Sequence, residues 1–155
     1  MPTGQGNAMS LVALLLNVLW LLFGGLAAGI AWGVASIIMA ITIIGIPWAR
    51  AAFNIAVYTL LPFGFKAVSR DDHFGHGDTG TGVLGAIGNV VWFVLAGWWL
   101  ALGHLFFAVV LAITIIGLPF AWAHLKLAGI ALWPIGKAIV SADDAPLRYP
   151  PPRRA

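Results

Sequence analysis

Apolar residues fill the first third of the chain almost without interruption. Residues 11–48 carry no formal charge, whereas a helix needs only about 20 apolar residues to cross a bilayer. One straight helix over this stretch would be about 57 Å long, and the hydrocarbon core of a membrane is about 30 Å thick. We therefore predict two helices that form a tight hairpin, with the reversal within residues 24–31, where glycines loosen the helix.

The same pattern occurs twice. Residues 41–47 (ITIIGIP) return as residues 113–119 (ITIIGLP), 72 positions later, and 21 of the 56 residues in 17–72 are identical to their counterparts in 89–144 without a gap. Such self-similarity indicates a tandem duplication. We divide the chain into an N-terminal arm (1–9), a first repeat (10–68), a polar linker (69–82), a second repeat (83–141) and a proline-rich basic tail (142–155).

The glycines near the predicted reversal allow a second interpretation. Gly25, Gly29 and Gly33 are spaced by four, which would place small residues on one face of a continuous helix and permit close packing. The second repeat keeps only Gly97 of the three. We favour the turn, and the packing surface remains the alternative.

Each repeat ends in a shorter segment with some polar positions. Arg50, Asn54 and Tyr58 recur every four residues, which predicts an amphipathic helix over residues 47–61 with proline in its first turn. The counterpart, residues 119–133, has His124 and Lys126 instead. Fifteen residues are too few for an easy span, so we predict interfacial helices, with Arg50, Asn54 and Lys126 at the cytoplasmic interface.

Composition points to a membrane. The chain is 61% hydrophobic and only 8% charged, whereas soluble domains have about 25% charged residues. It has no cysteine, so a disulfide or a thiolate metal site is excluded. No basic run with interleaved aromatic residues accompanies the net charge of +3, and we expect no nucleic-acid partner.

The basic residues predict the orientation. If each repeat contributes one hairpin, all eight lysines and arginines lie on the side of both termini, and the positive-inside rule places that side in the cytoplasm. Repeats of three spans would split these charges between the two sides. We therefore predict an all-α integral membrane protein with about four transmembrane helices, cytoplasmic termini, and pseudo-twofold symmetry about the membrane normal.

Several motifs together resemble a known family. Residues 17–21 (NVLWL), 97–104 (GWWLALGH), 113–119 (ITIIGLP) and 131–136 (ALWPIG) closely resemble the YccF family of bacterial inner-membrane proteins. The resemblance covers nearly the whole chain and is stronger in the second repeat. It implies a small multipass protein of the bacterial inner membrane, built from two inner membrane component domains, and it brings no substrate or activity. The first repeat departs from the pattern at Leu61 and Trp32.

The duplicated proline motif is the clearest candidate for function. Proline lacks a backbone N–H and clashes with the carbonyl four residues earlier, so each motif interrupts a helix. Broken helices coordinate ions or substrates in some transporters, which makes these positions candidates for a pore. We favour the other interpretation, in which each motif ends a spanning helix at the cytoplasmic surface, because Arg50 lies three residues beyond the first proline. The candidate positions are Thr42, Gly45, Pro47, Thr114, Gly117 and Pro119.

Three other polar residues lie within the apolar stretches. We predict that Asn17 and Asn89 contact neighbouring helices, with a pore as the lesser alternative. His104 is predicted at the interface, with proton sensing as its alternative. In the linker, residues 75–80 match G-x-G-x-x-G without a preceding strand, so we reject a dinucleotide site, and residues 71–78 suit a solvated linker as well as a metal site.

The functional prediction is a channel. The chain has no glutamate, and no catalytic constellation lies at membrane depth, so we expect neither an enzyme nor a cofactor nor a metal centre. Duplicated helix breaks and an uncharged membrane interior favour a homo-oligomeric channel for small ions, with the lipid bilayer as its surroundings. The alternative is an accessory or scaffold protein that binds a partner protein or lipid through its tryptophan-rich faces.

Overall fold

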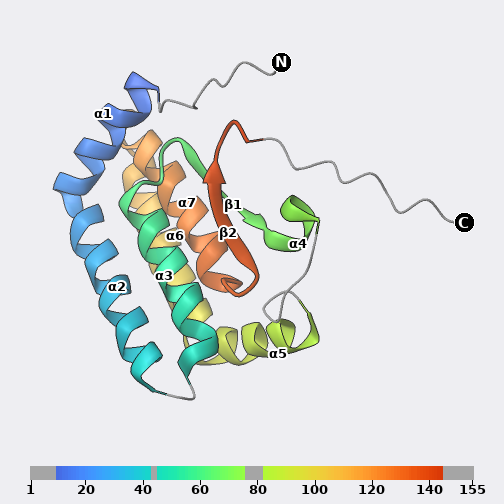
Figure 1. Ribbon diagram of the computed structural model, residues 1–155. Helices are drawn as coiled ribbons and strands as arrows, with labels where there is room; N and C mark the ends of the chain where they lie inside the picture. The colour runs from blue at the N-terminus through green and yellow to red at the C-terminus, as the bar shows by residue number, and fades with distance from the viewer. Residues whose placement is uncertain (1–9, 43–44, 76–81, 145–155) are drawn as a thin grey trace, which may run out of the picture.

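The computed structural model describes residues 10–42, 45–75 and 82–144, and it builds both repeats in the same way. Each repeat has a kinked helix, a helical hairpin and one short strand (Figure 1). The first repeat contains α1 (Leu11–Trp20), α2 (Leu26–Ile41), α3 (Ile46–Leu60) and β1 (Phe65–Ser69), followed by the short α4 (Arg70–Phe74). The second contains α5 (Val83–Trp92), α6 (Trp98–Ala112), α7 (Leu118–Leu132) and β2 (Lys137–Ser141).

The predicted reversal within residues 24–31 is wrong. A single π-helical turn over Leu21–Gly25 joins α1 to α2, and the kink is centred on Gly24, whose φ of 128° suits glycine. The helix therefore bends and continues where a turn was expected. Of the glycines in the alternative packing surface, Gly25 and Gly29 are buried, and a Cβ at Gly29 would meet Leu60 of α3 at 2.5 Å.

The chain instead reverses between α2 and α3, and again between α6 and α7. In the first hairpin the Ser36 hydroxyl donates to the carbonyl of Ala49, with an O···O distance of 2.7 Å. The segments predicted as separate interfacial helices are thus the second arms of the two hairpins. Both α3 and α7 lie between an outer helix and the strands, which they contact (Figure 1).

The strands were missed by the all-helical prediction. β1 and β2 pair antiparallel, and Ala67 lies opposite Ile139 at the centre of the register. These two positions are 72 residues apart, which is the period of the duplication. Equivalent strands that pair antiparallel around an equivalent residue are related by a local twofold axis. The sheet therefore joins the repeats at their axis of pseudosymmetry.

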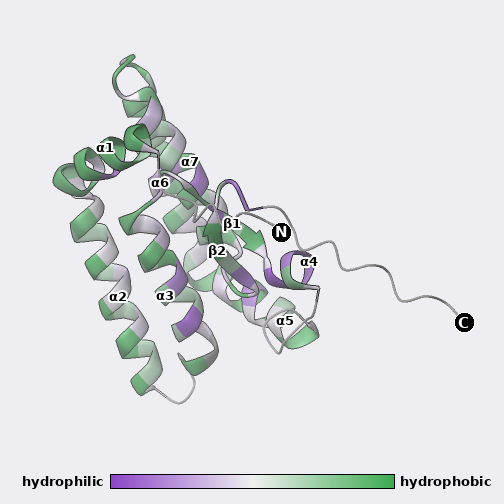
Figure 2. Cartoon of the chain, turned by 45° about the horizontal axis from the view of Figure 1, so that its top comes forward, coloured by the Kyte–Doolittle hydropathy of each residue, from purple (hydrophilic) through white to green (hydrophobic). Residues whose placement is uncertain are grey.

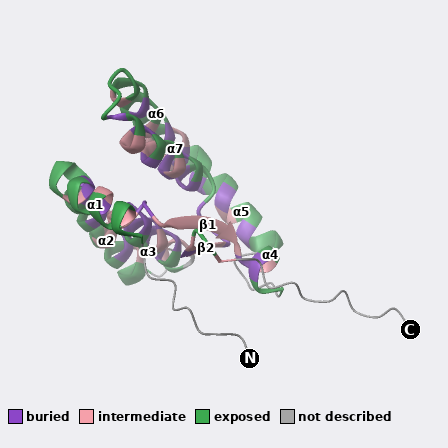
Figure 3. Ribbon diagram, turned by 90° about the horizontal axis from the view of Figure 1, so that it is seen from above, coloured by how far each residue is buried: buried purple, intermediate pink, exposed green. Residues whose placement is uncertain are grey.

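The core forms where the repeats cross. Buried side chains of both hairpins meet there, while the outer sides of α1, α2 and α6 are largely exposed (Figure 3). Hydrophobic residues cover those outer helices, and hydrophilic residues gather on α4 and on parts of α3 and α7 (Figure 2). The core cluster consists of Trp20, Ile55, Tyr58, Phe63, Ala123, Leu127 and Ile130.

Two helical stretches are long and apolar enough to cross a membrane. They are Leu11–Ile41 and Val83–Ala112, each of which includes a kink. The other hairpin arms, α3 and α7, have 15 residues each, which corresponds to about 22 Å at 1.5 Å per residue. In the described part of the chain, two segments therefore have the length of a spanning helix, and the four spanning helices that were predicted are not confirmed.

Candidate functional site: a basic pocket between the repeats

The predicted membrane asparagines fasten each kinked helix to its own hairpin. Asn17 donates from Nδ2 to the carbonyl of Phe63 (2.9 Å) and accepts from the Phe63 N–H (3.1 Å). Asn89 makes the same two bonds to Ile135, both at 3.0 Å. Both asparagines are buried, so their amide groups face protein backbone. The prediction was a contact with a neighbouring helix, whereas both asparagines bond the non-helical segment that follows the second hairpin arm.

Two tryptophans reinforce this attachment. The indole N–H of Trp20 donates to the carbonyl of Thr59 at 2.6 Å, and that of Trp92 donates to Ala131 at 2.8 Å. Each tryptophan follows its asparagine by three residues, so both side chains lie on one helix face. The last carbonyls of a helix have no partner within the helix, and these tryptophans satisfy one of them near the end of α3 and of α7.

The duplicated proline motifs form the turns of the hairpins. The hydroxyl of Thr42 donates to Met39 O (3.0 Å) and that of Thr114 to Leu111 O (3.2 Å). A Cβ at Gly45 would lie 2.5 Å from Met39 O, and one at Gly117 would overlap the Leu111 carbonyl. The motif therefore ends one helix and, with proline in the first turn, begins the next.

The side chains around the second turn are strongly exposed. Ile113, Ile115 and Ile116 are each more than 80% exposed, so this turn presents an apolar tip. The threonine hydroxyls are bonded to their own helix ends. These contacts give Thr42, Gly45, Thr114 and Gly117 a structural role in the turns.

His104 has a partner that its position in the sequence did not indicate. Its Nδ1 lies 3.0 Å from Nδ1 of His124, across the second hairpin. The ring of His124 is also flanked by Trp20, with centroids 5.0 Å apart, and by Phe107 at 5.4 Å. The first repeat has Trp32 and Ala52 at the two histidine positions, so this pair belongs to the second repeat only.

The residues predicted at the cytoplasmic interface reach across to the other repeat. Asn54 Nδ2 donates to Lys137 O at 2.9 Å, and Lys126 Nζ donates to Phe65 O at 3.3 Å. Lys126 also donates to Pro62 O. Positions 54 and 126 are equivalent, as are 65 and 137, so these bonds form a symmetric pair. The polar face of α3 is turned toward the second repeat, and the place of these residues at the cytoplasmic interface stays a prediction.

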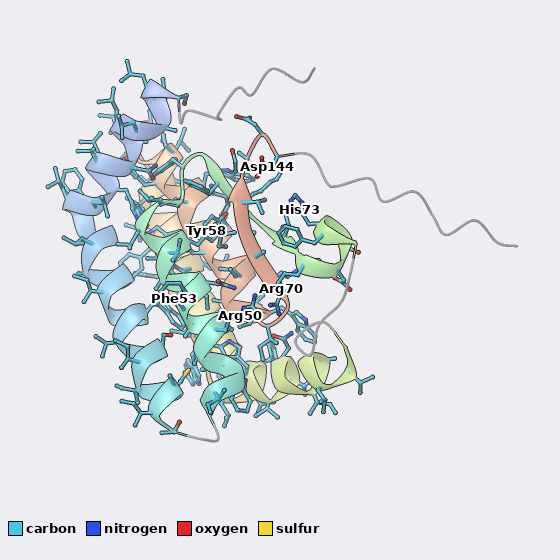
Figure 4. All side chains as sticks on the ribbon, in the orientation of Figure 1. Arg50, Phe53, Tyr58, Arg70, His73 and Asp144 are labelled. Atoms are coloured by element: carbon cyan, nitrogen blue, oxygen red, sulfur yellow. The ribbon has the colours of Figure 1, made fainter. Side chains whose placement is uncertain are left out.

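Arg50, on the same face of α3, lines a cavity of about 580 Å³. The cavity lies between α3, α5 and the residues that flank the two strands (Figure 4). One wall is closed by Trp48, whose indole N–H donates to Gly88 O at 3.2 Å. Its lining includes three cationic side chains, Arg50, Arg70 and Lys137, and the apolar side chains of Ile46, Leu84 and Val91. We call this cavity the basic pocket.

The charged side chains that line the basic pocket are all positive, while Asp71, outside this lining, interacts electrostatically with Lys137. Arg50, Arg70 and Lys137 contribute three positive charges, and no acidic side chain is among the described residues that line the cavity. Arg70 is only 9% exposed. Cations gathered around a low-dielectric cavity create a positive potential that attracts anions. The pocket can therefore bind an anion, and its apolar walls can accommodate a hydrocarbon chain.

Comparison with known proteins identifies the family. The family model of YccF, described as an inner membrane component domain, matches residues 15–65 and 87–137. The chain belongs to the YccF family. It is 34% identical over 134 residues to the inner membrane protein YccF of Escherichia coli K12, which covers 84% of this chain and 88% of that relative. A Shigella flexneri protein of the same name gives the same values. No solved structure matches the chain.

Membership of the YccF family makes this an inner-membrane protein, in agreement with the resemblance seen in the motifs. Sequence reasoning singled out Arg50 but missed Arg70 and Lys137 as its partners in the pocket. A signal for both existed in the chain: Lys137 follows the turn of residues 134–136 directly, and Arg70 follows the strand after the equivalent turn. The equivalence of the two turns could have placed both cations near the twofold axis.

Proposed function

We propose that the protein is a non-catalytic accessory protein of the inner membrane, anchored by its two hairpins and able to bind a partner at the basic pocket. This proposal rests on where the polar side chains of the apolar helices form their hydrogen bonds. Asn17, Asn89, Trp20 and Trp92 direct their polar groups to the backbone of their own hairpins. A channel for ions needs polar groups or carbonyls that face a pathway, and these groups are engaged elsewhere.

The distribution of charge supports a cytoplasmic position for the sheet. Lys66, Arg70 and Lys137 lie on or beside the strands, and Asp71 and Asp72 lie on α4. The outer helices carry exposed apolar side chains (Figure 2). The positive-inside rule then orients the sheet, the basic pocket and α4 toward the cytoplasm, with α2 and α6 in contact with lipid.

The depth of insertion follows from the helix lengths. α2 has 16 residues and α6 has 15, so each extends about 22–24 Å beyond its kink, less than the roughly 30 Å of hydrocarbon. The apolar tip at Ile115 and Ile116 is suited to remain within the lipid. We therefore propose that the hairpins enter the membrane from the cytoplasmic side and return to it.

Single cysteines test this topology, because the natural chain has none. A cysteine at Gly77 should react with an impermeant maleimide only from the cytoplasmic side. A cysteine at Ile116 should react from neither side until detergent is added. Periplasmic labelling at Ile116 would show that the second hairpin spans the bilayer, and periplasmic labelling at Gly77 would reverse the orientation.

Ion flux tests the functional class. Purified protein in liposomes should give no more flux than empty vesicles, and mass measurement in detergent shows whether copies associate. Flux from a homo-oligomer would replace the accessory role by the competing proposal, a channel for small ions. In that event Pro47→Ala and Pro119→Ala should alter the flux if the duplicated turns line the pathway.

A further inference from the structure

We propose that the basic pocket binds the phosphate headgroup of an anionic phospholipid from the cytoplasmic leaflet. This inference deepens the proposed function and rests on the cytoplasmic placement of the sheet. In this proposal the lipid phosphate lies among the three cations, and the first part of the acyl chains lies along the outer wall of α5.

The basic pocket breaks the symmetry of the fold. Rotation about the pseudo-twofold axis carries Trp48 onto Phe120, Gly88 onto Leu16 and Lys137 onto Phe65, 72 residues away in each case. On that other side the space is filled, because Leu16, Phe65 and Phe120 all pack against the core cluster. Phe120 stacks on Trp20 at 6.3 Å and meets Phe63 edge-on at 5.9 Å.

The open side is therefore a consequence of particular residues. Glycine at position 88 leaves out the side chain that Leu16 contributes in the first repeat, and a Cβ there would already lie 2.8 Å from Ile135 Cδ1. Well-packed interiors leave few voids larger than a water molecule. A cavity of about 580 Å³ is instead in the range of ligand sites.

The two sides of the pseudo-twofold axis also differ in charge. Three cations occupy the open side, where the equivalents of Arg50, Arg70 and Lys137 are the uncharged Trp122, Ala142 and Phe65. Guanidinium groups match the oxygen geometry of phosphate, which they can bind through two parallel hydrogen bonds.

The apolar wall of the pocket favours a lipid over a soluble anion. The pocket is walled by Ile46 of α3 and by Leu84, Ile87 and Val91 of α5. Leu84 is 72% exposed and Ile46 is 55% exposed, so this wall continues onto the outer apolar surface. A phosphate between cations and an open apolar edge is the arrangement of a phospholipid at the membrane interface, where basic pockets beside membrane helices bind lipid headgroups.

The test measures lipid binding to the full chain purified in a neutral detergent. Phosphatidylglycerol, phosphatidylcholine and inorganic phosphate are titrated separately, and native mass spectrometry and the thermal unfolding midpoint are recorded. Phosphatidylglycerol should bind and raise the midpoint, and the other two should do neither at the same concentration. Equal binding of phosphatidylcholine would overturn the proposal, as would inorganic phosphate binding as strongly as the lipid.

Variants locate the site. Arg50→Gln and Lys137→Gln should each weaken phosphatidylglycerol binding about tenfold or more, because each removes a charge-assisted hydrogen bond. Gly88→Leu, which restores the filling residue of the first repeat and keeps every charge, should weaken it equally. Lys66→Gln is the matched control: it removes one positive charge from β1 outside the pocket, and binding should stay within about twofold.

A folding control is needed before the binding of the variants can be interpreted. Circular dichroism confirms folding of each variant, and if Gly88→Leu does not fold, Val91→Trp narrows the same wall from the outer side. Wild-type binding in the folded pocket variants, or an equal loss in Lys66→Gln, would overturn the assignment. The ion-flux assay tests the accessory role separately from the lipid site. If the protein binds lipid and also conducts ions, only the accessory role is refuted. If it neither binds lipid nor conducts ions, only the lipid site is refuted.

Discussion

Replacement of Asn89 by alanine should destabilise the protein more than replacement of the half-buried Asn54 of α3 by alanine. The amide of Asn89 makes two hydrogen bonds to the backbone of Ile135, and both residues are buried. Alanine removes both bonds at once. It leaves the Ile135 N–H and C=O without these partners in a place that water reaches poorly.

The magnitude follows from the two groups. A buried backbone group that loses its partner costs about 1–3 kcal/mol, so two groups together cost about 2–6 kcal/mol. Polar contacts within membranes have measured values nearer 0.6 kcal/mol, which lowers the expectation. We expect a loss of about 3 kcal/mol, a large fraction of the roughly 5–15 kcal/mol that stabilises a typical protein.

The assay is reversible unfolding in mixed micelles with increasing dodecyl sulfate, followed by circular dichroism. Asn17→Ala is the internal replicate, because Asn17 makes the equivalent bonds to Phe63, and it should cost a similar amount. Asn54→Ala is the matched control: Asn54 is half-buried and donates one bond to Lys137, so about 1 kcal/mol is expected. A loss for Asn89→Ala no larger than that of Asn54→Ala would refute the reasoning.

Two other predictions concern the kink and the short helix α4. Gly25→Ala should lower the free energy of unfolding by about 2 kcal/mol, because the new Cβ would overlap the indole of Trp20. Gly33→Ala places its Cβ in open space and should instead stabilise α2 by about 0.5–1 kcal/mol. The same unfolding assay compares the two variants. The hydroxyl of Ser69 holds the pKa of Asp71 below its usual range, so this carboxylate contributes stability above its unfolded pKa that is lost as the pH falls through the folded value. Ser69→Ala should raise the pKa of Asp71, and an unchanged NMR titration midpoint would contradict this.

Most of the correct predictions from the sequence came from the duplication. Because the chain aligns with itself at a fixed shift, Asn17 and Asn89 could be paired in advance, and both make the same contacts. The position of the hairpin turn could not be found by the same reasoning. The thickness of a bilayer suggested a break near Gly24, yet a glycine with positive φ can kink a helix without ending it.

The strands were hidden by their length and by their separation. Residues 65–69 (FKAVS) and 137–141 (KAIVS) are five-residue segments whose partners lie 72 positions apart, so no hairpin signal joins them. The basic pocket was hidden for a related reason. Arg50, Arg70 and Lys137 are far apart in the chain, and only the crossing of the repeats brings them to one cavity.

The antiparallel pairing of β1 with β2 also bears on the origin of the chain. Two equivalent strands that pair around their own midpoint are what a symmetric homodimer of a single repeat would form, and the linker of residues 69–82 turns that encounter between molecules into one within a molecule. A homodimer of either repeat alone would lack the basic pocket, because Arg50 comes from one repeat and Lys137 and Gly88 from the other. Once the two halves are one chain they can diverge, so that the matched residues preserve the fold and the mismatched ones create a cavity on one side of the axis only.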